Sequence, residues 1–83
     1  GYRALRMKLA EIHVNNHATL SVGSNPYWGV KGDAQLSMSD GTTTYDLDVS
    51  NISGSKCIFF ETFNNAAVPP PAVVKISEIL LMR

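Results

Sequence analysis

The alternating segment 41–50, GTTTYDLDVS, constrains the fold of this chain more than any other feature. It follows Asp40-Gly41, a dipeptide typical of tight turns. Its apolar side chains recur at every second position, at Tyr45, Leu47 and Val49, and polar residues fill the positions between them. Such a period of two predicts a strand with one buried face.

A second strand is predicted shortly after this one. Ile52 supplies one apolar anchor, Ser53-Gly54-Ser55 predicts a turn, and the apolar run 57–60 follows. Cys57 opens that run, and we expect it to be a small buried apolar residue. A single thiol cannot form an internal disulfide, and no Cys/His spacing here resembles a zinc site.

The segment 2–14 is open to two interpretations. It is rich in good helix formers, and Leu5, Leu9 and Ile12 would share a helical face. Its alternation also fits a strand whose register changes near Ala10-Glu11, as a β-bulge would produce. We favour the strand, because the rest of the chain has the pattern of strands and an antiparallel sheet needs neighbours.

Strands are also predicted over 17–22, 34–39 and 72–82. Asn15-Asn16 predicts a turn that joins 3–14 and 17–23 as a hairpin, and Asp40-Gly41 predicts a second hairpin between 34–39 and the central strand. In the last strand the inward set shifts register, which predicts a second bulge at Ser77-Glu78. The residues of that set are Val74, Ile76, Ile79 and Leu81.

Five or six closely spaced strands predict an all-β fold, an antiparallel β-sandwich or a barrel, over one domain, 1–83. A sheet structure of this size leaves edges that must be covered or paired. The seven basic and seven acidic residues cancel, and only 17% of the chain is charged. A neutral surface argues against nucleic acid and against electrostatic binding to a membrane, and no apolar run is long enough to span a bilayer.

Four short motifs resemble the C-terminal half of galactose-binding-domain-like β-jelly rolls. They are Asp48-Val49-Ser50, Ile52-Ser53-Gly54, Ile58-Phe59-Phe60 and Ile76-Ser77-Glu78-Ile79. The opening run, YRALRMKL, is similar to a core strand of that superfamily. The resemblance implies a sandwich of jelly-roll type. Members usually have a strand or two before the equivalent of Tyr2, so we expect a fold truncated at its N-terminus or completed by a neighbouring chain.

The same resemblance implies a binding module on a cell surface or a virion. Carbohydrate-binding modules, discoidin-like domains and accessory domains of cell-surface and phage tail proteins share the scaffold. Many relatives hold a structural calcium ion with an acidic residue of the closing strand, here Glu78. Their other calcium ligands come from an N-terminal strand that this sequence lacks, so we expect no metal and no cofactor.

The loop 23–33, GSNPYWGVKGD, carries the sharpest functional hypothesis. Tyr27 and Trp28 could stack on the apolar face of a sugar ring, and polar neighbours could supply hydrogen bonds. These neighbours are Asn25 and Asp33, with Asn64 and Asn65 from the second irregular loop. A single Trp in a Gly-Pro loop is frequently a lid over the end of a sandwich, and that structural role is slightly favoured over a sugar contact.

No residue set argues for catalysis. His13 and His17 flank the predicted Asn15-Asn16 turn but lack a third metal ligand, and the outward-facing Asp46 and Asp48 are typical of a solvated strand. The sequence therefore predicts a non-catalytic carbohydrate-binding module that is extracellular or on a virion. The alternative is a structural domain of a phage tail, virion or surface fibre that forms a homo-oligomer through its sheet edges.

Overall fold

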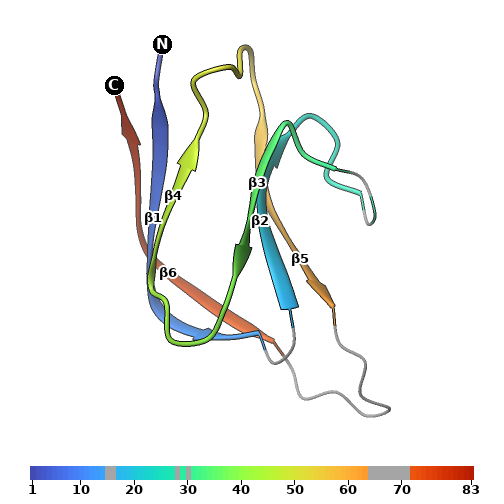
Figure 1. Cartoon of the computed structure of the whole chain (residues 1–83), viewed down its shortest axis with the longest axis vertical. Helices are drawn as coiled ribbons and strands as arrows, with labels where there is room; N and C mark the ends of the chain where they lie inside the picture. Colours follow the sequence, from blue (N-terminus) through green and yellow to red (C-terminus); the bar gives the residue numbers. More distant parts are fainter. Residues whose placement is uncertain (15–16, 28, 30, 64–71) are drawn as a thin grey trace.

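Six β-strands build the chain in its computed structural model, which describes residues 1–14, 17–27, 29, 31–63 and 72–83. The strands are β1 (Ala4–His13), β2 (His17–Gly23), β3 (Ala34–Met38), β4 (Thr44–Asp48), β5 (Cys57–Phe63) and β6 (Val73–Met82). They form two antiparallel three-stranded sheets, β4-β1-β6 and β3-β2-β5, which face each other as in a β-sandwich (Figure 1). The predicted all-β antiparallel fold is confirmed, and 2–14 is a strand.

Both predicted hairpins are wrong. β1 and β2 lie in different sheets, and so do β3 and β4, whereas only β2 and β3 follow one another within one sheet. The turn at Asp40-Gly41 is present, with Gly41 at a φ of 89°, but it carries the chain across to the opposite sheet. A turn dipeptide reverses the chain in either case and does not specify which strand the next segment pairs with. The predicted turn at Asn15-Asn16 lies outside the described residues.

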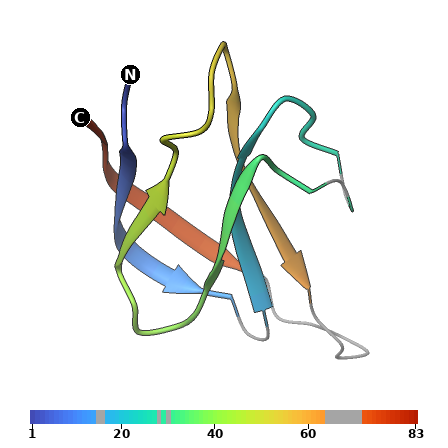
Figure 2. The same cartoon turned by 45° about the horizontal axis from the view of Figure 1, so that its top comes forward.

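Both predicted bulges are confirmed, and they offset each other. The register pairs around this point are Lys8 with Glu78, Leu9 with Ile76 and Glu11 with Lys75. The pairing thus skips Ser77 on β6 and Ala10 on β1, which restores the alignment of the two strands. Both strands bend sharply there (Figures 1 and 2), as bulges are expected to cause.

The core lies between the two sheets and is centred on β1 and β2. The inward side chains of β4 are buried as predicted, at Tyr45 and Leu47, and Val49 follows them. The largest fully buried side chains are Met7 on β1 and Leu20 on β2, the central strands of the two sheets. Strict alternation in the sequence therefore placed the core face of these strands correctly.

The two sheets lie close on one side and apart on the other. Cα atoms of β3 and β4 approach within 8 Å, whereas none of the described residues of β5 and β6 do so. β5 and β6 are the outer strands on this open side. Both chain ends also lie beside each other at one end of the first sheet (Figures 1 and 2).

Candidate functional site

The loop predicted to bind sugar is fastened to the second sheet by side chains from outside it. The Lys56 ammonium lies 3.0 Å from the Asp33 carboxylate and donates a hydrogen bond of 2.9 Å to the hydroxyl of Ser24. The Gly29 amide donates to the Glu61 carboxylate on β5 at 2.6 Å. These contacts hold both ends of the loop against Lys56, which directly precedes β5, and its middle against β5 itself.

The predicted sugar contacts are only partly described. Tyr27 is 72% exposed, and its amide donates a hydrogen bond of 2.9 Å to the carbonyl of Asn25. Asn25 and Asp33 are exposed, although Asp33 is already paired with Lys56. Trp28, Asn64 and Asn65 lie outside the described residues, so their proposed contact with a ligand stays a prediction.

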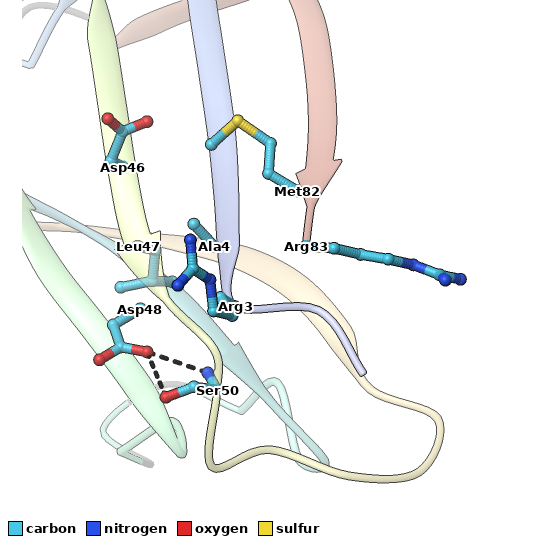
Figure 3. A pocket seen from close by; sticks show the side chains of 8 residues that line it. All are labelled: Arg3, Ala4, Asp46, Leu47, Asp48, Ser50, Met82 and Arg83. Atoms are coloured by element: carbon cyan, nitrogen blue, oxygen red, sulfur yellow. Dashed lines mark hydrogen bonds between the residues drawn. The ribbon is translucent and has the colours of Figure 1, made fainter.

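A shallow hollow of about 550 Å³ lies on the first sheet near the chain ends (Figure 3). It is lined by Arg3, Ala4, Asp46, Leu47, Asp48, Ser50, Met82 and Arg83. Figure 3 shows the Arg83 side chain pointing away from the other lining residues, and its guanidinium carbon lies 5.4 Å from the centre of the Tyr2 ring. The hollow therefore does not gather its cations around one point.

The two carboxylates of this hollow are already bound within the protein. The Arg6 guanidinium donates two hydrogen bonds to Asp46, of 2.7 and 2.9 Å, and lowers the pKa of that carboxyl. The hydroxyl and amide of Ser50 donate to Asp48 at 2.7 and 2.9 Å and lower its pKa as well. Both contacts favour the ionised form, so neither carboxyl has the raised pKa that suits a general acid.

On the open side of the molecule, the inward face of β6 is left exposed. Residues directly opposite in an antiparallel pair share a sheet face, so Leu81 on β6 lies on the same face as Leu5 on β1. Leu5 is 3% exposed and Leu81 is 52% exposed. The inward face of β6 was predicted correctly, but its burial was not, because no strand of the second sheet covers β6 among the described residues.

Four large apolar side chains of β6 are exposed, three on the inward face and Leu80 on the outward face. We call them the β6 surface, and they are Ile76, Ile79, Leu80 and Leu81. Beside them, a groove of about 470 Å³ runs between the sheets, and its lining includes Leu5, Ile58 and Leu81. An outer strand with exposed apolar side chains is a site where another strand can add. The sequence signal for it was the run ILLM, which is apolar on both faces.

Charged pairs flank the β6 surface. The Lys75 ammonium lies 2.9 Å from the Glu11 carboxylate, and this hydrogen bond raises the pKa of Lys75 and lowers that of Glu11. Lys8 and Glu78 form a second, longer pair at 3.7 Å. The outward side of β6 therefore carries one charge of each sign, and each is matched by a charge of β1.

The remaining candidates do not form a site. Cys57 is exposed, so the prediction that it is buried is wrong: it starts an outer strand, opposite Gly23. His13 lies 3.4 Å from Glu11, and the predicted hairpin that would have placed it opposite His17 is absent. No three His, Cys, Asp or Glu residues come together within the described ranges. None of the described segments is a helix that could cross a membrane.

Comparisons with protein-family models, with curated proteins and with solved structures found no match for this chain.

Proposed function

We propose that this domain is a non-catalytic structural module that self-assembles through the edge of β6. The observation that carries the proposal is the β6 surface, a set of exposed apolar side chains on a strand that pairs only with β1 in the described part of the chain. Burying such side chains contributes about 25 cal/mol for each Å² removed from water, and the unpaired strand edge supplies main-chain hydrogen bonds to a neighbouring strand.

Sedimentation velocity over a series of protein concentrations tests this function. We expect the wild type to associate, and we expect Leu80→Lys to remain a monomer because it places a charge within the β6 surface. Thr42→Lys is the matched control, because it adds the same charge at an exposed turn position far from β6 in the sequence. A wild type that stays monomeric at every concentration, with native circular dichroism, would overturn the proposal.

A second candidate function is carbohydrate binding through the 23–33 loop. It is favoured by the 72% exposure of Tyr27 on a loop that Lys56 and Glu61 hold in place, since an exposed aromatic ring can stack on a sugar. A glycan array followed by titration with Tyr27→Ala and Trp28→Ala tests it. An unchanged affinity for a confirmed glycan would remove both residues from the site.

We also propose that the fold has jelly-roll topology and is related to galactose-binding-like domains. The open side of the sandwich supports the expectation that a neighbouring chain completes the fold. A location outside the cell or on a virion stays a prediction from the resemblance.

A further inference from the structure

We infer that the partner of β6 is a second copy of this chain, paired antiparallel about a two-fold axis at the bulge, with Lys75 opposite Glu78 of the second copy. This inference rests on the proposed function and specifies its partner and register. The first sheets of the two copies then form one continuous sheet of six strands, in the order β4-β1-β6-β6-β1-β4.

The bulge restricts the registers that such a dimer can adopt. The pairing with β1 places residues 73, 75, 78, 80 and 82 of β6 on the outward face, and 74, 76, 79 and 81 on the inward face. Odd-numbered residues thus face outward before Ser77, and even-numbered residues face outward after it. When β6 pairs antiparallel with β6 of a second copy near this bulge, two registers place inward residues opposite inward ones and outward opposite outward over most of the strand. In one register residue 75 lies opposite residue 78 of the second copy, and in the other it lies opposite residue 80. Other offsets place inward residues opposite outward ones.

Charge distinguishes these two registers. The first pairs Lys75 with Glu78 twice, once on each side of the axis, whereas the second sets Lys75 opposite Leu80. In the first register the charges of β1 extend the pattern, since Glu11 already pairs with Lys75 and Lys8 with Glu78. One row across four strands then reads negative, positive, negative, positive. Opposite charges that lie directly across a strand pair stabilise it.

Four apolar positions of β6 also meet apolar positions in this register. On the inward face Val74 meets Ile79 of the second copy, and on the outward face Val73 meets Leu80, each pair occurring twice. Ile76 meets Ser77 at the axis, where the Ser77 hydroxyl already donates to the Lys8 carbonyl at 3.0 Å. A bulge and a lysine often protect an edge from pairing. Here the antiparallel copy places a second glutamate, Glu78, opposite Lys75, which already pairs with Glu11, so these features select the partner.

The bend of the strand is also compatible with two-fold pairing. β1 and β6 bend together near the bulge (Figures 1 and 2). A two-fold axis perpendicular to the sheet at that point relates the bent strand to a neighbouring copy that bends toward the same face of the sheet. An isologous contact of this kind closes on itself, so it stops at a dimer.

Charge complementation between two variants tests the register. Lys75→Glu alone places Glu opposite Glu, and Glu78→Lys alone places Lys opposite Lys, so each variant should self-associate about tenfold more weakly, the effect of roughly 1.4 kcal/mol. A mixture of the two variants restores both attractions in a heterodimer. The changes within each monomer are the same before and after mixing, so recovery of the dimer on mixing reports the contact between copies and not folding stability.

Disulfide cross-linking supplies a second readout, in a Cys57→Ser background. Val73→Cys with Leu80→Cys puts thiols directly opposite each other, whereas the control, Val73→Cys with Met82→Cys, offsets them by two residues on the same face. Directly opposite Cβ atoms lie about 4.5–5.5 Å apart and diagonal ones about 7–8 Å, so oxidation should give a covalent dimer with the first pair and little with the second.

The outcomes separate this inference from the function on which it rests. Recovery on mixing together with cross-linking of the 73/80 pair alone supports the register. Association that Leu80→Lys abolishes, but with no recovery on mixing and no selective cross-link, overturns the register while the assembly function stands. A protein that remains monomeric in every condition overturns both.

Discussion

The Tyr45 hydroxyl satisfies both backbone polar groups of Ser39. It donates a hydrogen bond of 2.9 Å to the Ser39 carbonyl and accepts one of 3.0 Å from the Ser39 amide. Ser39 directly follows β3, and Tyr45 lies in β4 of the other sheet. The hydroxyl therefore fixes the connection that carries the chain from one sheet to the other. A buried ring with its polar end bonded in this way combines packing with positioning.

We expect Tyr45→Phe to destabilise the protein by about 0.5–1.5 kcal/mol, the net contribution of a hydrogen bond, because the Ser39 carbonyl keeps a second donor, the Thr42 amide, at 3.3 Å. The ring stays in the core, so the loss measures the two hydrogen bonds. Urea denaturation followed by circular dichroism gives the free energy of unfolding. The matched control is Tyr27→Phe, which removes the hydroxyl from an exposed ring. Equal stability of Tyr45→Phe and the wild type would contradict the structural role of the hydroxyl.

Gly32 allows the loop after β2 to return close to that strand. A Cβ atom at position 32 would lie 2.9 Å from the Val22 carbonyl oxygen and 3.0 Å from the Ser21 Cβ. Because one of these neighbours is backbone, Gly32→Ala should destabilise the protein by about 1–3 kcal/mol through overpacking. Gly1→Ala is the control, since nothing lies within 4 Å of its Cβ position. Thermal melting curves that coincide for both variants would show that the loop can move aside freely.

The features predicted correctly from the sequence are local ones. The period of two identified the strands and the inward face of β4, and the register shifts identified both bulges, because each signal lies within a few neighbouring residues. Strand pairing was predicted wrongly at both Asn15-Asn16 and Asp40-Gly41. A turn signal there says that the chain reverses, but the choice between pairing and crossing depends on segments far away in the sequence.

Which side chains are buried on the open side could also not be predicted from neighbouring residues in the sequence. Leu81 and Leu5 belong to the same sheet face, yet only Leu5 is covered. Coverage depends on how far the opposite sheet extends, which no pattern within β6 records. The β6 surface, the proposed functional site, could therefore be recognised only after the two sheets had been placed against each other.

Cys57 is expected to react with a thiol reagent in the native protein. It is exposed at the start of β5, so a disulfide reagent that reports each reacted thiol by absorbance should titrate one equivalent without denaturant. Cys57→Ser should abolish the signal and leave the circular dichroism unchanged. A thiol that reacts only after urea is added would mean that the side chain is covered in solution.

Acid is expected to weaken the fold through the Arg6–Asp46 contact. Hydrogen bonds from Arg6 hold the pKa of Asp46 below its usual value, which is about 3.9 for an unfolded chain. The ionised form is thus favoured in the folded state, so the stabilisation is complete above about pH 5 and is lost as the pH falls through the folded-state pKa. Urea midpoints measured from about pH 6 to 2 should fall more steeply for the wild type than for Asp46→Asn, which has no proton to gain at that position. Parallel curves for the two proteins would show that this pair adds nothing to the acid sensitivity of the fold.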